Sequence, residues 1–182
     1  MPLITTPRTI IDVLTSDDAQ ALQHYYVSNK EHLAPWEPMR GDDYFSLTNM
    51  QQLITQGIEG FEQKSNFRFV AFAPDRNTII GCANFTGVMR GVFQACFLGY
   101  SIDKQFEGQG YMTEILDGTI QYMFEHEKLH RIMANYMPKN KASARVLEKC
   151  QFEEEGYARQ YLKIAGCWED HVMTARLNPN FE

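Results

Sequence analysis

Hydrophobic and polar positions follow a helical period in three segments of the chain. Apolar residues recur at spacings of three and four after Ser16, after Ser46 and from Tyr111 to His126. This period is typical of amphipathic helices, and serine is a residue that often begins one. A shorter helix is expected from Ala142 to Cys150.

Strands are predicted where short runs rich in aromatic and branched residues alternate with polar ones. These runs cover residues 8–14, 67–73, 78–85, 92–103, 130–137, 157–164 and 168–177. Gly87 to Gly91 is expected to interrupt the sheet, and two prolines should prevent a regular helix over residues 32–38. The order of elements predicts one α+β domain over residues 1–182, with helices interrupting a mostly antiparallel sheet.

Composition narrows the class of protein. A chain of 182 residues with 44% hydrophobic and 22% charged residues fits one globular domain. It has no apolar run of membrane-spanning length and no secretory signal near Met1, so we expect a cytoplasmic protein that does not bind a membrane. The net charge of −6 argues against direct nucleic-acid binding and is compatible with a cationic partner.

The four cysteines are Cys82, Cys96, Cys150 and Cys167, and none forms a C-x-x-C pair. They are therefore interpreted as small buried apolar groups rather than as disulfides or metal ligands.

The stretch from Leu98 to Met112 is predicted to form a strand, a glycine turn and the start of an amphipathic helix. The first amides of a helix have no internal partner and lie at the positive end of the helix dipole. Gly108 and Gly110 would let a phosphate approach that backbone closely. The turn alone is a weak signal, because Thr113 replaces the last glycine of G-x-G-x-x-G and no Walker lysine is present.

The surrounding residues resemble the GNAT family of N-acetyltransferases, whose coenzyme A loop reads Q/R-x-x-G-x-G/A. Residues 105–110 match this pattern literally, whereas residues 107–112 place the loop correctly after the strand. Downstream, Asn140-Lys141-Ala142-Ser143 resembles the family's N-x-x-S segment. Residues 147–156 resemble its L-x-x-x-G-F-x-x-E-G segment, with Gln151 in place of the first glycine.

Five further segments resemble ribosomal-protein-alanine N-acetyltransferases of the RimJ type within that family. They are residues 32–38, 80–85, 98–102, 130–138 and 166–171, and together they span nearly the whole chain. The resemblance implies a GNAT-type acyl-CoA N-acyltransferase fold, in which helices flank a central mixed, mostly antiparallel sheet. It also implies acetyl-CoA as donor without a metal, and the N-terminal alanine of a ribosomal protein as acceptor. Two alternatives are an acetyltransferase for a small amine or antibiotic and a non-catalytic CoA-binding regulator.

The acid–base chemistry of the acceptor favours an α-amine over a lysine. At pH 7 roughly a tenth of an α-amine with a pKa of about 8 is neutral, against less than about one part in a thousand for lysine. Many relatives carry a glutamate base where this chain has Leu98, two positions before Tyr100. The absence of a glutamate base is consistent with an α-amine acceptor, because a larger fraction of that amine is already neutral.

The resemblance also implies roles for individual residues. Ser143 is the candidate that protonates the departing thiolate, with a simple helix cap as the alternative. Trp36 and Glu37 are expected to border the acceptor groove, unless Trp36 fills the core and Glu37 is a solvated charge. Asp170 is a second candidate on the amine side. The residues expected to bind coenzyme A are Tyr100, Ile102, Glu107, Gly108, Gln109, Gly110, Tyr111, Met112 and Asn140.

Two other patterns have competing interpretations. His126-Glu127-Lys128-Leu129-His130 matches the zinc-protease motif H-E-x-x-H, but the helix should end there and no third ligand follows, so we expect no metal. The basic cluster of Lys139, Lys141, Arg145 and Lys149 is either a solvated helix face or an attraction for the 3′-phosphate of the coenzyme.

Overall fold

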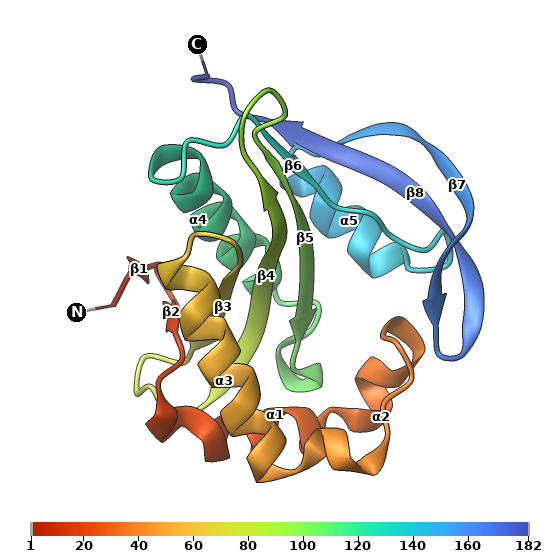
Figure 1. Cartoon of the computed structure of the whole chain (residues 1–182). Helices are drawn as coiled ribbons and strands as arrows, with labels where there is room; N and C mark the ends of the chain where they lie inside the picture. Colours follow the sequence, from red (N-terminus) through yellow and green to blue (C-terminus); the bar gives the residue numbers. More distant parts are fainter. Residues whose placement is uncertain (1, 182) are drawn as a thin grey trace.

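A computed structural model describes residues 2–181, which form an eight-stranded sheet flanked by helices (Figure 1). The sheet order is β1-β2-β3-β4-β5-β6-β8-β7, and only β5 and β6 pair in parallel. The expected α+β architecture with a mixed, mostly antiparallel sheet is therefore confirmed. The strands are β1 Ile4–Thr5, β2 Ile10–Val13, β3 Phe67–Phe72, β4 Ile79–Met89, β5 Ala95–Ile102, β6 Arg131–Met133, β7 Glu153–Ile164 and β8 Cys167–Leu177.

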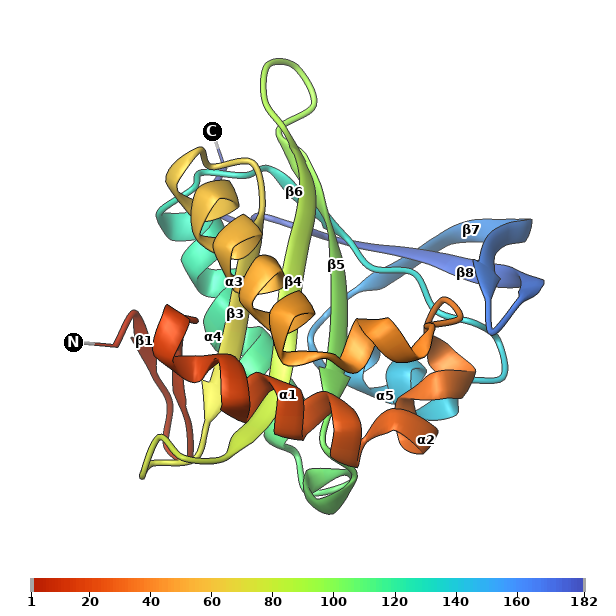
Figure 2. The ribbon, with the colours of Figure 1, turned by 60° about the horizontal axis from the view of Figure 1, so that its bottom comes forward.

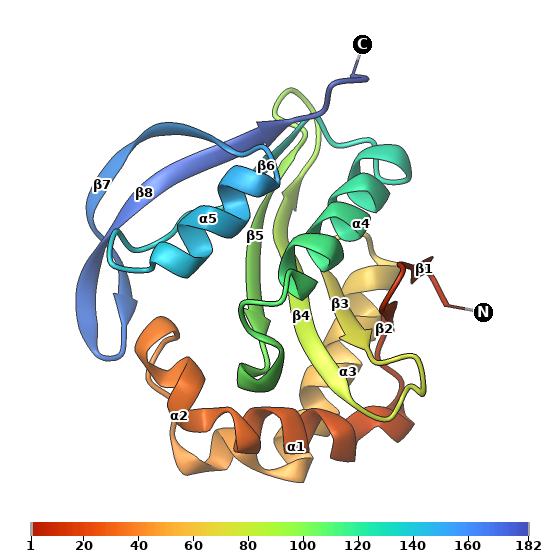
Figure 3. The same cartoon turned by 180° about the vertical axis from the view of Figure 1, so that it is seen from behind.

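Helices cover both faces of the sheet. They are α1 Ala19–Ser28, α2 Lys30–Leu33, α3 Leu47–Glu62, α4 Tyr111–Glu125 and α5 Lys141–Lys149, joined by short 3₁₀ turns. Figure 1 shows α3 in front of the sheet, and Figure 3, from behind, shows α4 and α5 against the opposite face. Each face has its own apolar core, because alternate residues of a strand point to opposite sides. In β3, Phe69 packs toward α4 and Val70 packs toward α1 and α3.

The helix predictions are confirmed closely. The Ser46 side chain accepts a hydrogen bond from Asn49 N–H (3.2 Å) and so caps α3, as expected of a serine before an apolar stripe. Residues 32–38 form no regular helix beyond α2, since Ala34–Trp36 is a single 3₁₀ turn. Pro35 is tolerated there because the first turn of a helix does not need its missing N–H.

Some of the strand boundaries that we predicted are wrong. Strand β4 continues past Gly87 to Met89, and the chain reverses instead at Gly91 and Gln94, which both have positive φ. Val92 and Phe93 are therefore exposed in the turn rather than part of β5, and Figure 2 shows this turn projecting beyond the helices. Strand β6 ends at Met133, and only Tyr136 regains a single bridge, to Val172.

The cysteine interpretation is confirmed for Cys82, Cys96 and Cys150, which are buried thiols, but it is wrong for the exposed Cys167. Cys167 lies at the turn between β7 and β8, where no core covers it.

The sheet opens between β5 and β6. These strands pair only where residues 95–97 face residues 131–133, so the edge of β5 from Leu98 to Ile102 lacks a neighbouring strand within residues 2–181. Asp103 donates its backbone N–H to Ile80 O (2.8 Å), toward β4. Because successive residues of a strand face opposite edges, Tyr100 and Ile102 direct their N–H groups into the opening. No helix of residues 2–181 is both long and apolar enough to cross a bilayer.

Candidate functional site

The glycine turn presents free backbone amides at the start of α4. Gly108 (φ 73°) and Gly110 (φ 82°) adopt the left-handed conformation that favours glycine, and Gly110 is the N-cap residue. The first intrahelical bond runs from Glu114 N–H to Gly110 O (3.2 Å). The N–H groups of residues 111–113 therefore have no acceptor inside this 15-residue helix. Their alignment with the helix dipole makes the turn suited to an anion such as a pyrophosphate.

The predicted loop residues differ in what they can offer a ligand. Glu107, Gly108, Gln109 and Gly110 are exposed, so their backbone is accessible. The side chain of Met112 is buried in the core at 5% exposure, which leaves only its backbone for binding.

Arg8 contacts the glycine turn and fixes its orientation. Its guanidinium donates to Gln109 O (3.0 Å), pairs with Glu114 (2.7 Å) and lies 4.0 Å from the ring centre of Tyr111. Because the peptide group is planar and trans, the Gln109 carbonyl and the Gly110 N–H point in opposite directions. The contact therefore directs the Gly110 N–H away from Arg8. Sequence reasoning missed Arg8, since nothing in a local pattern connects it to a loop about a hundred residues later.

Tyr100 and Ser143 form a hydrogen-bonded pair beside the opening in the sheet. The Tyr100 hydroxyl lies 2.6 Å from Ser143 Oγ, and either atom can donate. Burial raises the pKa of Tyr100 far above its usual value, against the lowering effect of the Ser143 hydrogen bond, so the phenol keeps its proton. The two residues that the sequence assigned to the donor site are thus brought together.

Asn140, not Ser143, caps helix α5. Asn140 Oδ1 accepts the backbone N–H of Ser143 (3.0 Å), which leaves the Ser143 hydroxyl for Tyr100. The alternative that Ser143 serves only as a helix cap is therefore wrong. The cap uses one lone pair of Asn140 Oδ1 and leaves its amide nitrogen as the donor for the expected contact with the coenzyme.

A pocket of about 270 Å³ lies on the opposite face of the sheet. Apolar side chains from α1 and α3, including Leu22 and Ile54, line it together with Arg68, Asn84 and Thr86 of β3 and β4. Asn84 pairs with Gly99 of β5 in the sheet register. The pocket therefore reaches β4, the strand that pairs with β5, whose far edge forms the opening.

Glu37 lines this pocket, whereas Trp36 does not. The carboxylate of Glu37 is half-buried and lies 3.9 Å from Arg40. Loss of hydration raises the pKa of Glu37 above its usual value, although Arg40 opposes the shift. Its backbone carbonyl accepts the N–H of Ala165 (2.9 Å) at the β7–β8 turn, which fixes the loop across the end of the sheet. Trp36 is 37% exposed, so neither a core role for Trp36 nor a fully solvated Glu37 agrees with the structure.

Asp170 forms its hydrogen bonds within the β7–β8 hairpin. It accepts hydrogen bonds from the Tyr157 hydroxyl (2.6 Å) and from the Gln160 N–H (2.8 Å). These bonds, the one from Tyr157 first, lower its pKa. Asp170 does not line the pocket, so its expected place on the amine side is not supported.

The H-E-x-x-H segment lacks the geometry of a zinc protease. Helix α4 ends at Glu125, before both histidines, so the two rings do not share one helical face. The buried carboxylate of Glu127 pairs with Arg90 (2.7 Å) and Lys64 (3.4 Å), which gives it a structural role. Within residues 2–181 no group of histidine, cysteine, aspartate and glutamate side chains is arranged to hold a metal ion.

The basic cluster divides into two parts. Lys139 pairs with Glu169 (2.6 Å), whereas Lys141, Arg145 and Lys149 are exposed at spacings of four along α5. Residues four apart lie on one helical face, so the three cations form a positive stripe.

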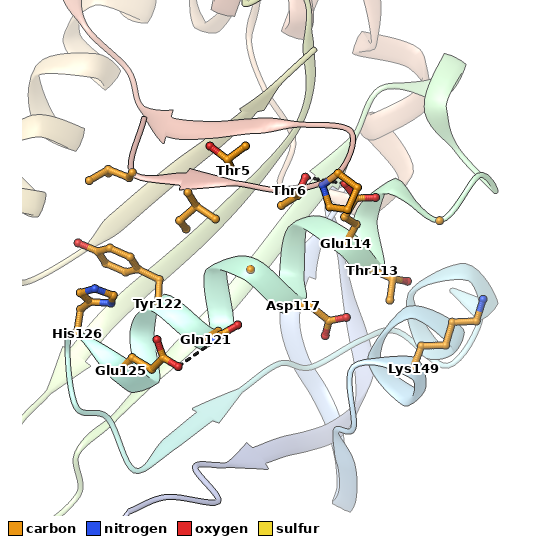
Figure 4. A pocket seen from close by; sticks show the side chains of 15 residues that line it. Thr5, Thr6, Thr113, Glu114, Asp117, Gln121, Tyr122, Glu125, His126 and Lys149 are labelled. Atoms are coloured by element: carbon orange, nitrogen blue, oxygen red, sulfur yellow. Dashed lines mark hydrogen bonds between the residues drawn. The ribbon is translucent and has the colours of Figure 1, made fainter. Parts of the chain in front are cut away.

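A wider depression of about 710 Å³ lies along the outer side of α4 (Figure 4). Glu114, Asp117 and Glu125 line it, and Lys149 of α5 is its only lysine or arginine. Glu114 pairs with Arg8 and Asp117 with Arg176, so the charge of Glu125 offsets that of Lys149 and this larger cavity attracts a polyphosphate less than the amides of the glycine turn.

Comparison with known proteins agrees with this arrangement. Residues 8–153 match the family model described as an acetyltransferase (GNAT) domain. The chain is 44% identical to the [ribosomal protein uS5]-alanine N-acetyltransferase of Escherichia coli over 178 residues, which cover 98% of this chain and 92% of that relative.

Solved structures give the same result. The ribosomal-protein-S5-alanine acetyltransferase of Vibrio fischeri superposes with a TM-score of 0.92 at 37% identity, covering 96% of this chain and 95% of that one. RimJ of Mycobacterium smegmatis, in complex with CoA-disulfide, gives 0.89 at 25% identity and covers 96% and 86%. These similarities confirm the expected GNAT-type fold.

Proposed function

The chain belongs to the GNAT acetyltransferase family, and we propose that it transfers the acetyl group of acetyl-CoA to the N-terminal alanine of a ribosomal protein. The amine attacks the thioester directly. One observation carries the proposal: β5 has an open edge and leads into the amide-rich turn of α4, and its other edge pairs with β4, which lines the pocket under α1 and α3. A ribosomal protein as acceptor also agrees with a cytoplasmic place of action.

The donor is held mainly by backbone groups. The free amides at the start of α4 and the left-handed Gly108 and Gly110 fit a pyrophosphate, and exposed Glu107 and Gln109 flank it through their main chain. The N–H groups of Tyr100 and Ile102 fit the amide-containing arm of the coenzyme along the open edge of β5. The Asn140 amide nitrogen contacts the same arm, and the exposed positive stripe on α5 attracts the 3′-phosphate of the coenzyme.

Bound acetyl-CoA supplies an activated thioester carbonyl. The backbone N–H of Tyr100, which faces the opening, stabilises the negative charge that develops on the carbonyl oxygen. No strong base is needed, because an α-amine with a pKa of about 8 is partly neutral near pH 7. This agrees with the buried Leu98 at the position where relatives carry a glutamate base.

The Tyr100–Ser143 pair supplies the proton that the coenzyme sulfur takes up. Ser143 Oγ gives its proton to the departing sulfur, and the proton that the attacking nitrogen loses as the amide forms restores the Ser143 hydroxyl through water. The phenol of Tyr100, 2.6 Å away, keeps its proton and donates a hydrogen bond to Ser143 Oγ. A thiolate with a parent pKa near 8.5 is a good leaving group, so a hydroxyl acid is sufficient.

The acceptor enters through the pocket on the other face. Glu37, half-buried and only loosely paired with Arg40, attracts the incoming ammonium group. Trp36, beside it and partly exposed, provides an apolar wall at the mouth.

An acceptor panel tests the proposal. The purified chain is incubated with acetyl-CoA and a peptide that begins with the N-terminal alanine of a ribosomal protein. Parallel reactions contain the same peptide with a blocked α-amine and internal lysines, spermidine, or free amino acids. We expect CoA release and α-acetylation only with the free N-terminus. Acetylation of small amines in preference to the peptide would support the small-amine enzyme instead. CoA binding without turnover on any acceptor would support the non-catalytic regulator.

A further inference from the structure

The pocket under α1 and α3 contains a charge that acetyl transfer alone does not explain. Arg68 is half-buried in β3 and lines the pocket, yet within residues 2–181 its guanidinium has no ion-pair or hydrogen-bond partner. The other arginine of the pocket, Arg40, is held by Glu37 at 3.9 Å and by the ring of Tyr44 at 4.2 Å. A cation that is partly removed from water binds an anion more strongly than a fully solvated one, so this guanidinium is available for an anionic ligand.

The sheet register connects Arg68 to the reaction centre. Arg68 is opposite Asn84, and Asn84 is opposite Gly99, so these three positions form a row across β3, β4 and β5 on one face. Nothing lies within 4 Å of the position that a Cβ of Gly99 would occupy. The row therefore runs from the free guanidinium to open space at the strand that borders the opening in the sheet.

The spacing of the row matches a short peptide. Neighbouring strands lie about 4.8 Å apart, so Arg68 and Gly99 are separated by roughly 10 Å along the row. An extended chain advances about 3.3 Å per residue. With the reacting amine beside Gly99, the guanidinium falls near the second to fourth residues of the acceptor.

We propose that Arg68 binds a carboxylate side chain at one of these positions, so that the pocket selects N-termini that carry aspartate or glutamate there. The planar guanidinium can bind both carboxylate oxygens, and the Asn84 carboxamide, itself without a partner within residues 2–181, adds a donor. Apolar walls from Leu22 and Ile54 keep the pair partly desolvated, which strengthens it. The inference rests on the proposed acetylation of a protein N-terminus.

Matched peptides test this assignment. Each begins with alanine and carries either glutamate or glutamine at position two, three or four, in an otherwise identical sequence. For the wild-type enzyme we expect kcat/KM to be about tenfold higher with glutamate at one of these positions, as for a hydrogen bond to a charged group. Arg68→Met should remove the difference by slowing the glutamate peptide to the rate of the glutamine peptide. Arg68→Lys should keep part of it, and acetyl-CoA affinity should not change.

Arg131→Met is the matched control, because Arg131 is also a half-buried strand arginine but lies in β6 outside the pocket. It should keep the wild-type preference, and thermal unfolding verifies that each variant is folded. Equal wild-type rates for glutamate and glutamine at all three positions would overturn the role of Arg68 while leaving the proposed function intact. A preference that survives Arg68→Met would do the same. If no peptide were acetylated at all, the proposed function would fail and the inference with it.

Discussion

At the scale of single residues, the hydroxyl groups of Tyr100 and Ser143 are the groups best placed to deliver a proton. They are 2.6 Å apart, and neither is needed to cap α5, because Asn140 does so. Ser143→Ala should lower kcat by roughly 10²-fold, the lower end of the range for a general acid, because the leaving thiolate is already stable. Tyr100→Phe should have a smaller effect in the same direction. Steady-state kinetics measure both, and a normal kcat in Ser143→Ala would exclude it as the acid.

The ionisation of Glu37 gives a second prediction. Loss of hydration raises the pKa of this carboxyl above its ordinary 4.5, so it becomes protonated at a higher pH than a solvated glutamate. The attacking amine must also lose a proton, with a pKa of about 8. In the wild type, log(kcat/KM) for the peptide should therefore rise with a slope of two below the pKa of Glu37, with a slope of one between it and the pKa of the amine, and level off above the latter.

Glu37→Gln should retain only the slope of one, with a lower kcat/KM near neutral pH and unchanged acetyl-CoA affinity. Thermal unfolding over the same pH range separates this effect from loss of the folded state. A slope of two that persists in Glu37→Gln would assign the second proton to another group.

The proposed donor residues are marked in the sequence more clearly than the proposed acceptor residues. The glycine turn, Tyr100 and Ser143 are close in the chain to recognisable patterns, and the structure brings them to one edge of the sheet. Arg8 and Arg68 were missed because their roles depend on strand register and on contacts between distant segments. The one available signal was the charge of Arg68 within the otherwise apolar run of β3.

At the scale of elements, α1 is joined to the donor loop by one buried side chain. Asn29 follows α1, donates to Tyr25 O (2.9 Å) and Asp103 Oδ2 (2.8 Å), and accepts the N–H of Lys104 (3.0 Å). Asp103 in turn accepts the N–H of Gln105 (2.8 Å) at the start of the loop. The end of α1 and the start of the loop proposed to bind pyrophosphate are thus held by the same network.

Asn29→Ala should leave the Lys104 N–H and the buried Asp103 short of partners, which costs about 1–3 kcal/mol of stability. Because the loop loses its anchor, we also expect CoA affinity to fall severalfold in calorimetry. Asn178→Ala is the control, since Asn178 donates a comparable bond to Leu129 O (3.0 Å) outside the donor loop. An equal loss of affinity in the control would show a general effect of instability rather than loop positioning.

The same scale explains which elements could be predicted. Helix α3 and the β7–β8 hairpin were anticipated because a Ser46 cap and an Ala165-Gly166 turn mark them locally. Strand β6 was predicted too long, because the alternation of residues 130–137 continues after the chain has left the sheet at Met133. The extent of β4 was also hidden, since the sheet tolerates Gly87 within an irregular part of the β4–β5 pairing.

At the scale of the whole molecule, the groups proposed to bind the donor and the acceptor lie on opposite faces of the sheet. The amides of α4 and the Tyr100–Ser143 pair face one side, and the pocket with Glu37 and Arg68 faces the other. The strand β5 lies between them: its open edge faces away from β4, and β4 lines the pocket. Both substrates can therefore be bound at once, without a stage in which the protein carries the acetyl group.

The cysteines agree with such a direct transfer. Burial raises the pKa values of Cys82, Cys96 and Cys150 to about 12, so none of them forms a reactive thiolate near neutral pH. Cys167 is exposed at the β7–β8 turn and lines neither the pocket nor the glycine turn.

We therefore expect initial-rate plots with varied acetyl-CoA and peptide to intersect, as for a ternary complex, rather than to run parallel as in ping-pong kinetics. Intact-protein mass spectrometry after incubation with acetyl-CoA alone should show no acetylated enzyme. Cys167→Ser should retain wild-type rates, which separates adventitious labelling of the exposed thiol from catalysis. Parallel lines together with a stable acetyl-protein that forms on one of the buried cysteines would contradict direct attack and require an acyl-enzyme route.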